Sequence, residues 1–220
     1  DVIERKSTLL IPVFSLERTQ VMIHELDKLF TMKGLKSIPV FLDSPLAINI
    51  TEIYRDRFNS KDKDLYFNKL QETAQVRDSI SISHVPGPKI IMAGSGMSTA
   101  GRIVHHEERY LPDPNATILF VGYQAAGTLG RLIQDGVKEV TINDKNIKVN
   151  ARVLSIGGFS AHADSDQLVK FVEASEKSVK QVFITMGEPK SSIFLAQRLK
   201  DELGVDSVIP EKGKRYELDL

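Results

Sequence analysis

Cysteine is absent from the 220 residues of this chain. Disulfide bonds and thiolate zinc sites are therefore excluded, and any metal ligands would have to be His, Asp or Glu side chains. Long hydrophobic runs are also missing, since no apolar stretch approaches the roughly 18 residues that a membrane span needs. The opening residues DVIERKST contain no secretory segment. We expect a cytoplasmic protein with no membrane partner.

The chain also lacks an excess of charge of either sign, because 29 Lys and Arg residues balance 29 Asp and Glu residues. Without a global basic surface, a nucleic-acid site would have to be local. The hydrophobic content of 41% is enough for the core of one large or two small domains. The chain starts at Asp1 rather than at a methionine and soon enters an apolar run, so we interpret it as a piece of a longer protein.

Apolar runs rich in β-branched residues alternate with amphipathic stretches along almost the whole chain. This alternation is typical of an α/β protein in which helices cover both faces of a mostly parallel sheet. We expect strands at residues 8–14, 38–43, 89–94, 117–122, 151–156 and 181–187.

Local signals predict helix starts and one hairpin. Ser44 followed by Pro45 is typical of the first residues of a helix. Asp164 and Gln167 have the spacing of a capping box. Alternating residues on both sides of the sequence NDKN, within residues 136–156, predict a β-hairpin.

A glycine-rich turn, MAGSGMSTAGR, follows one expected strand at residues 92–102. Its glycines allow a tight turn and a close approach to a ligand, and its hydroxyl groups lie at a helix start, where backbone N–H groups and the helix dipole can hold a phosphate. The candidate phosphate-binding residues are Gly94, Ser95, Gly96, Ser98, Thr99 and Gly101. Spacing alone favours the alternative of a capped tight turn, since the stretch is neither a GxGxxG motif nor a P-loop.

A second turn, VGYQAAGTLGR at residues 121–131, repeats the pattern of glycines, a Thr cap and an Arg. Tyr123 and Gln124 could stack on or hydrogen-bond a base, although a tyrosine at a strand end is more often a packed rim residue. Because the carboxyl ends of parallel strands share one edge of a sheet, we expect both turns to face the same crevice.

The histidines offer two further candidate sites. His162 lies in the stretch GGFSAHADSD, just before a helix start, where the dipole favours anions. A histidine that only hydrogen-bonds its own loop is the competing interpretation. For His105, His106 and Glu108, a metal site fits the spacing, but a solvated helix face is the better interpretation.

Five ordered motifs resemble those of the β-CASP family, the metallo-β-lactamase-fold nucleases that process RNA, with some members acting on DNA. The motifs read LLIPVFSLERTQ, FLDSPLAINITEIYRDRF, MAGSGMSTAGRIVHH, LFVGYQAAGTLGR and GFSAHADSDQL. The resemblance is closest to prokaryotic members related to the pre-mRNA 3′-end cleavage endonuclease. It implies a Rossmann-like β-CASP domain at residues 1–150. Residues 151–220 would be the C-terminal segment of a metallo-β-lactamase domain whose metal-binding N-terminal half is absent from this chain.

The resemblance also implies roles for particular residues. In the family, the histidine of Ser-Ala-His lies beside the scissile phosphate, so His162 is expected to be catalytic, assisting the leaving group or steadying the charge. Ser160 and Ala161 are expected to help cradle a phosphate. The serines and glycines of residues 94–101 resemble the family's contacts to the RNA backbone.

Zinc is the cofactor that the resemblance implies, with two ions in the full-length protein. The family's ligand cluster His-x-His-x-Asp-His is absent here, and Met186 stands where the family has a metal-ligating histidine. A thioether is a poor replacement for imidazole on zinc. We therefore expect no metal site in this chain and no tight zinc binding by the chain alone.

The leading hypothesis is the RNA-clamping portion of a zinc-dependent ribonuclease that hydrolyses single-stranded RNA, as an endonuclease, a 5′-exonuclease or both. We expect the chain to be inactive alone and to need the missing half of the metallo-β-lactamase domain, while homodimerisation stays open. The alternative is a non-catalytic RNA-binding or scaffold member of the same family, which Met186 favours. A dinucleotide-binding enzyme is a weaker third hypothesis, since no GxGxxG motif is present.

Overall fold

The computed structural model describes residues 1–34, 38–57, 70–159, 162–175 and 179–218. The chain forms two compact units, residues 1–160 and residues 161–220. Within the described ranges, no helix combines the length and the apolar character needed to cross a membrane.

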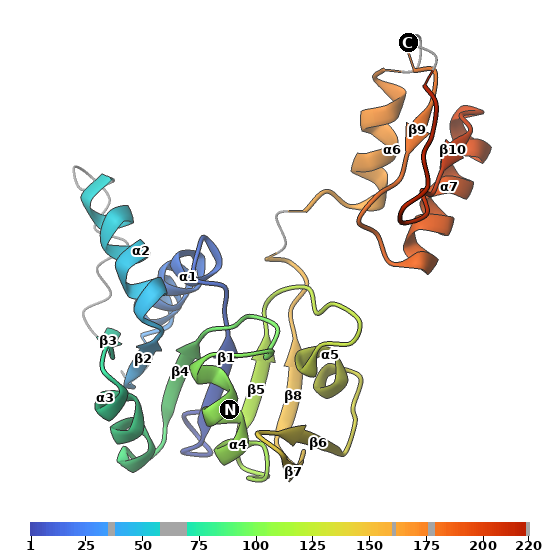
Figure 1. Cartoon of the computed structure of the whole chain (residues 1–220). Helices are drawn as coiled ribbons and strands as arrows, with labels where there is room; N and C mark the ends of the chain where they lie inside the picture. Colours follow the sequence, from blue (N-terminus) through green and yellow to red (C-terminus); the bar gives the residue numbers. More distant parts are fainter. Residues whose placement is uncertain (35–37, 58–69, 160–161, 176–178, 219–220) are drawn as a thin grey trace. The chain divides into compact units, whose positions relative to one another are not determined.

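A six-stranded sheet forms the centre of the first unit (Figure 1). Its strand order is β3-β2-β4-β1-β5-β8, and every neighbouring pair is parallel. The strands are β1 (Thr8–Pro12), β2 (Val40–Asp43), β3 (Leu70–Glu72), β4 (Lys89–Ala93), β5 (Thr117–Phe120) and β8 (Arg152–Ser155). All six strands therefore end at one edge of the sheet, which we call the carboxyl edge.

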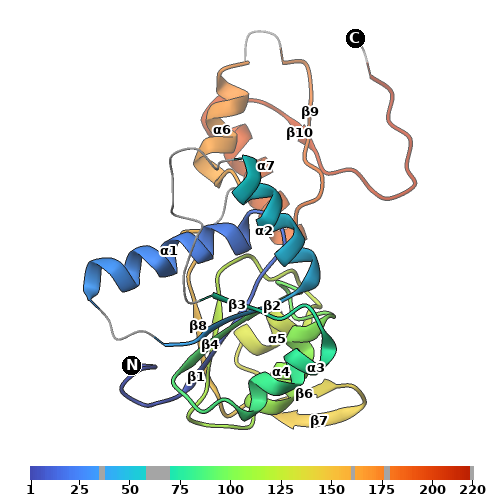
Figure 2. The same ribbon diagram turned by 90° about the vertical axis from the view of Figure 1, so that its left-hand side faces the viewer.

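Helices cover both faces of this sheet (Figure 2). Neighbouring residues of a strand point to opposite faces, so Leu10 and Ile11 of β1 belong to two different buried cores. The core around Ile11 includes side chains of α1 and α2, and the core around Leu10 includes side chains of η2, α4 and α5. The helices are α1 (Arg18–Lys33), α2 (Pro45–Arg57), α3 (Val76–Ser81), the 3₁₀ helix η2 (Ile82–His84), α4 (Arg102–Tyr110) and α5 (Leu129–Gln134). Burial on both faces explains why the strands read as continuous apolar runs.

The hairpin predicted within residues 136–156 is confirmed. It consists of β6 (Glu139–Ile142) and β7 (Lys145–Lys148), which pair antiparallel. Asn143 and Asp144 form its turn with φ of 49° and 59°, a conformation that these two residue types tolerate better than most. Its apolar side chains join the core around Leu10.

The second unit is smaller, and its described residues form two helices and two short strands. Its buried core consists of Val169, Ile184 and Leu199. The strand expected at residues 181–187 pairs with its neighbour over only two residues. The elements are α6 (Ser165–Glu173), β9 (Val182–Phe183), α7 (Pro189–Leu203) and β10 (Ser207–Val208).

The expected α/β fold, with a parallel sheet between helices, is confirmed. The capping box is also confirmed, because the Gln167 N–H donates to Asp164 Oδ1 at 2.8 Å and the Asp164 N–H donates to Gln167 Oε1 at 2.9 Å. At the start of α2, Ser44 Oγ accepts a hydrogen bond from the Ala47 N–H at 3.3 Å.

Candidate nucleic-acid interface

Three chain segments lie side by side at the carboxyl edge. β4 runs into the turn at residues 94–101, β5 runs into the turn at residues 121–131, and β1, which lies between these two strands, runs into Phe14. The expected placement of both glycine-rich turns at one edge is confirmed. Phe14 adds an aromatic ring whose residue is 42% exposed.

Two glycines of the first turn are required by close packing. A Cβ atom at Gly101 would lie 2.4 Å from the carbonyl oxygen of Gly94, and the φ of Gly101 is +79°. A Cβ atom at Gly96 would lie 2.7 Å from the Phe14 ring. Side chains at either position would force the turn apart. The glycines therefore set the shape of the turn and hold it against Phe14.

The three candidate hydroxyl groups differ in their exposure. Ser95 Oγ accepts a hydrogen bond from the Thr99 N–H at 3.1 Å and lies 3.0 Å from Thr99 Oγ1. Thr99 is exposed and Ser95 is half-buried. Ser98 is buried and donates to a carboxylate oxygen of Glu107. Ser95 and Thr99 can thus contact a ligand, whereas the Ser98 hydroxyl points into the protein.

Glu107 of α4 is fully buried on the inner side of this turn. Burial raises the pKa of Glu107 from 4.5 to about 8, and the hydrogen bond from Ser98 offsets only part of that rise. Among the described residues, Glu107 Oε2 has no hydrogen-bond partner. Glu107 is therefore expected to be protonated at neutral pH, so it places no negative charge where a phosphate would approach Thr99.

Gln124 links the second turn to the first. Its Nε2 donates to the carbonyl oxygen of Gly96 at 2.9 Å and to that of Gly122 at 3.2 Å. The Gly130 N–H also donates to Met97 O at 3.0 Å. Gln124 is buried, so its side chain braces the two turns instead of reaching a base, while Tyr123 is 54% exposed.

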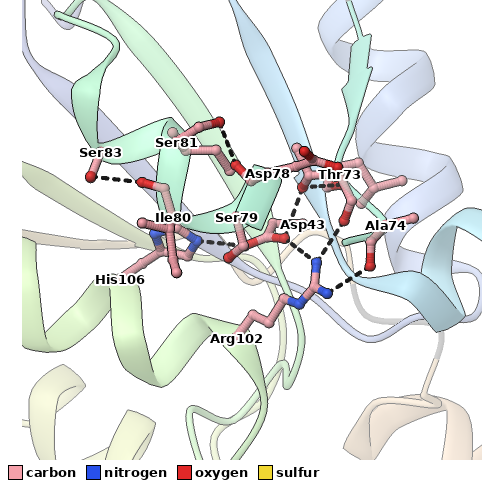
Figure 3. Close-up of polar contacts among 12 residues, drawn as sticks. Asp43, Thr73, Ala74, Asp78, Ser79, Ile80, Ser81, Ser83, Arg102 and His106 are labelled. Atoms are coloured by element: carbon pink, nitrogen blue, oxygen red, sulfur yellow. Dashed lines mark hydrogen bonds and ion pairs between the residues drawn. The ribbon is translucent and has the colours of Figure 1, made fainter. Parts of the chain in front are cut away.

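A buried carboxylate at the end of β2, that of Asp43, is bonded to side chains of α3 and α4 (Figure 3). Asp43 Oδ1 accepts from Arg102 Nη1 at 2.6 Å and from Thr73 Oγ1 at 2.8 Å, and Asp43 Oδ2 accepts from Ser79 Oγ at 2.5 Å and lies 2.7 Å from His106 Nε2. We call Asp43, Thr73, Ser79, Arg102 and His106 the Asp43 cluster. It joins β2, the segment after β3, α3 and α4 in one polar network.

Electrostatics favour the ionised form of Asp43. Burial alone would raise its pKa, but the hydrogen bonds from its four partners outweigh burial and lower the pKa from 3.8 to about 2. The interpretation of His105 and His106 as a solvated helix face is wrong for His106, which is 5% exposed because it bonds to Asp43. His105 is exposed, and Glu108 bonds to Lys145 on the hairpin.

In the second unit, His162 and Met186 line one open groove of about 870 Å³. Its wall also includes Lys190 and apolar side chains of α6 and α7. Met186 is fully exposed, with a φ of +64°. His162, the candidate catalytic residue, and Met186, where the resemblance predicts a metal-ligating histidine, therefore line the same groove. Ser160 and Ala161 lie outside the described residues.

The residues that the structure describes do not fit a zinc ion. Across the described ranges, no three His, Asp or Glu side chains come together as a metal site would require. His106, the most completely buried histidine, bonds to Asp43, and Met186 offers only a thioether.

Phe14 and Arg102 are the residues of this edge that the sequence analysis did not single out. Phe14 could have been found by the same signal as the turns, because it directly follows a buried strand of a parallel sheet. Arg102 had no such signal, since its partner Asp43 lies 59 residues earlier in the chain.

This fold and edge define an α/β protein whose loops gather at the ends of parallel strands. A sequence model of the Beta-Casp domain matches residues 19–133, and a model of the Zn-dependent metallo-hydrolase RNA specificity domain matches residues 146–210. The chain belongs to the Beta-Casp family, as the five motifs indicated.

Curated relatives cover nearly all of this chain. It is 31% identical to a transcription termination factor of Methanosarcina mazei over 94% of the chain and 35% of the relative. It is 32% identical to a ribonuclease of Thermus thermophilus over 86% of the chain and 45% of the relative. An RNase J-like protein of Methanocaldococcus jannaschii is 28% identical over 97% of the chain and 51% of the relative. The chain thus spans about a third to a half of the length of these relatives.

Proposed function

We propose that this chain is the RNA-clamping portion of a zinc-dependent ribonuclease that hydrolyses phosphodiester bonds in single-stranded RNA. The observation that carries the proposal is the match of residues 146–210 to an RNA specificity domain of metallo-hydrolases, next to a Beta-Casp match over residues 19–133. The ribonuclease of Thermus thermophilus, similar over 86% of the chain, supports the choice of reaction.

The turn at residues 94–101 binds the RNA backbone in this proposal. Thr99 and Ser95 present hydroxyl groups just before α4, whose amino end carries the positive end of the helix dipole. Gly94, Gly96 and Gly101 let the backbone come close to a phosphate. Contacts of this kind go to the sugar-phosphate backbone and carry little sequence information. The clamp should therefore accept many RNA sequences.

Phe14 provides a surface for a base beside that turn. Its carbonyl oxygen accepts hydrogen bonds from the Thr19 hydroxyl at 2.7 Å and the Thr19 N–H at 3.2 Å, which fixes its backbone at the start of α1. Its ring packs against Gly96 and stays partly exposed. Bases stack on aromatic rings of this kind without regard to sequence.

His162 is the residue that we assign to catalysis. It would donate a proton to the leaving oxygen or stabilise the negative charge on the phosphate. Its position in an open groove leaves it accessible to a substrate. Ser160 and Ala161 would help to cradle the same phosphate. In the full-length protein, replacing His162 with alanine should abolish ribonuclease activity while RNA binding persists, and unchanged turnover would contradict the assignment.

The two domains have separate tasks in the proposal. Residues 1–150 form the clamp, and residues 151–220 complete a nuclease lobe whose metal ligands come from another part of the full-length protein. Two zinc ions would bind there and none to this chain alone. Metal analysis of the purified chain should find no zinc, whereas zinc bound tightly by the chain would contradict this division.

RNA binding tests the clamp directly. Thr99→Glu places a negative charge beside the phosphate turn and should weaken binding of a fluorescent single-stranded RNA severalfold in an anisotropy titration. Thr141→Glu is the matched control, because Thr141 is exposed on the β6–β7 hairpin, which is not part of the carboxyl edge. Equal affinities for the two variants would overturn the proposal.

A non-catalytic RNA-binding protein is the second candidate, and Met186 favours it. If the full-length protein lacks a working metal site, Met186→His should raise its zinc content and its ribonuclease activity together. Met186→Gln controls for loss of the thioether. A parent protein that already contains two zinc ions and cleaves RNA would contradict this second candidate.

A further inference from the structure

A pocket of about 330 Å³ separates α3 and η2 from α4 in the first unit. Its volume is at the small end of the roughly 300–1,000 Å³ that is usual for ligand pockets. It shares no residue with the turn at residues 94–101. The lining residues are Val76, Ser79, Ile80, Ser83, Arg102, His105, His106 and Arg109.

Three members of the Asp43 cluster, Ser79, Arg102 and His106, line this pocket. Arg102 is held by Asp43 and by two backbone carbonyl groups, those of Thr73 at 2.6 Å and Ala74 at 2.7 Å. Ser79 and His106 are held by the same carboxylate. Because these side chains are already bonded, the wall is preorganised and does not need to reorder when a ligand binds.

The pocket lining also includes Arg109, a cation that forms no ion pair among the described residues. Arg109 and His105 are both exposed on α4. Glu108, which lies between them in the sequence, is bonded to Lys145 and Asn143 on the hairpin.

Lys89 is a second cation, and its charge interacts with that of Arg109. Burial and, to a smaller extent, the charge of Arg109 lower the pKa of Lys89 from 10.5 to about 8. The ammonium group of Lys89 donates to the carbonyl oxygens of Ile82 at 2.8 Å and Val85 at 2.5 Å, not to a carboxylate. A bound anion would relieve the repulsion between these two cations.

An apolar wall completes the pocket. Val76 and Ile80 are four residues apart on α3, so both side chains lie on one side of the helix. They are 68% and 59% exposed, which is unusual for two neighbouring aliphatic side chains on a short helix. A flat ring could cover both side chains and remove them from water.

We propose that this pocket binds a nucleotide, with the phosphate on Arg109 and His105 and the base against Val76 and Ile80. The nucleotide is either a free mononucleotide or one unit of an RNA strand. The site goes beyond the proposed clamp, because it uses other residues and does not depend on cleavage of RNA.

Titration of the isotope-labelled chain with adenosine 5′-monophosphate, followed by NMR, tests the site. Saturable shifts of backbone amides are expected in residues 76–83 and 102–110. Arg109→Gln should weaken binding about tenfold or more, because it removes charge-assisted hydrogen bonds to the phosphate. Arg77→Gln is the matched control, since Arg77 is exposed on α3 and does not line the pocket. Equal binding by both variants would overturn the proposal.

Ile80→Asp is a second variant, which puts a negative charge into the pocket at an exposed position. It should abolish the shifts while the rest of the spectrum keeps its folded pattern. Inorganic phosphate should bind more weakly than the nucleotide. Equal affinities would contradict the proposed contact between the base and the apolar wall. No shift of residues 76–83 or 102–110 with either mononucleotide or short RNA would overturn the site.

The Thr99→Glu variant distinguishes nucleotide binding in this pocket from RNA binding at the carboxyl edge. If the mononucleotide binds this variant normally, the pocket stands even where RNA binding at the carboxyl edge fails. If only RNA shifts residues 102–110, and Arg109→Gln removes that shift, the pocket holds a unit of the RNA strand.

Discussion

Asp43 in the first unit and Arg198 in the second each form several side-chain hydrogen bonds, and they differ in burial. Asp43 is fully buried and accepts hydrogen bonds from several side chains. Arg198 lies near the surface of the second unit and donates to Ser165 and Asp166 at 2.7 Å each, and to Glu202. Exposed ion pairs contribute about 0–1 kcal/mol, whereas breaking a buried pair costs about 3–5 kcal/mol. Removing the Asp43 carboxylate should therefore lower stability much more than removing the Arg198 guanidinium, although both groups form several bonds.

The apolar side chains show the same contrast between the units. The first unit has two continuous cores, one on each face of its sheet. Among the described residues, the second unit has a buried core of only Val169, Ile184 and Leu199. It leaves Phe171, Ile193 and Phe194 more than half exposed, although the first unit also exposes single apolar side chains on its helices. Exposed apolar surface of this kind is typical of a binding surface. The smaller core agrees with the proposal that the second unit is part of a larger nuclease lobe.

The largest effect is expected for Asp43→Ala. This variant leaves Arg102 and His106 without their partner, so the free energy of unfolding should fall by about 3–5 kcal/mol. Urea unfolding followed by circular dichroism at pH 7 measures the change. Asp135→Ala, which breaks the surface pair with Arg131, is the control and should cost about 1 kcal/mol or less. Equal losses would break the comparison between buried and exposed charges.

Two buried acids of the first unit should respond to pH in opposite directions. The pKa of Glu107 is raised to about 8, so between pH 4.5 and pH 8 the folded protein keeps a proton that the unfolded chain has released. The free energy of unfolding therefore falls as the pH rises through this window. Asp43, with a pKa lowered to about 2, contributes stability that is lost as the pH falls from 3.8 to 2.

Glu107→Gln tests the alkaline half of this prediction. The glutamine side chain cannot ionise. The free energy of unfolding should therefore fall less between pH 5 and pH 8 than it does in the parent protein, by an amount on the order of a few kcal/mol. Urea midpoints measured across this range provide the comparison. Glu108→Gln, at the adjacent but partly exposed position, is the control and should leave the slope unchanged. A slope that survives in Glu107→Gln would show that another group causes it.

Phe14→Ala should separate RNA binding from stability. Stacking of a base on an aromatic ring contributes about 1–3 kcal/mol, so RNA affinity should fall about tenfold. Leu29→Ala on α1 removes a side chain of similar exposure, 45% against 42%, and should leave affinity unchanged. The circular dichroism spectrum of each variant checks the fold. Undiminished affinity of Phe14→Ala would remove this residue from the interface.

The smallest effect is expected for Arg198→Met. The variant keeps an aliphatic side chain on α7 but loses the bonds to Ser165, Asp166 and Glu202. Hydrogen exchange in α6 should become slightly faster, while exchange in the first unit stays unchanged. Arg198→Lys keeps the positive charge, so its exchange rate in α6 should lie between those of the parent protein and Arg198→Met. A global loss of structure would contradict the low value given to exposed pairs.

Local signals in the sequence predicted much of the fold. Apolar runs located five strands of the main sheet, and the cap at Ser44 and the turn at Asn143 are encoded by neighbouring residues. β3 had no such signal, since it is three residues long, contains two polar residues, and depends on pairing with β2. The Asp43 cluster was also missed, because its members come from positions up to 63 residues apart.

The candidate site was predictable to the extent that it follows strand ends. The turn at residues 94–101 was located from its glycines and from its place after a buried strand. The sequence does not predict which of the three hydroxyl groups is buried, because Ser95, Ser98 and Thr99 look equivalent in it. The left-handed φ of Ser98, +57°, turns that side chain toward Glu107. Only the folded backbone distinguishes Ser98 from Ser95 and Thr99.

Photo-crosslinking of a 4-thiouridine-containing single-stranded RNA to the chain, with the attached peptides identified by mass spectrometry, tests the central claim most directly. The proposed clamp predicts crosslinks at Phe14 and within residues 94–101, and their loss in Thr99→Glu but not in Thr141→Glu. Crosslinks confined to the β6–β7 hairpin or to the second unit, unchanged by Thr99→Glu, would contradict RNA binding at the carboxyl edge.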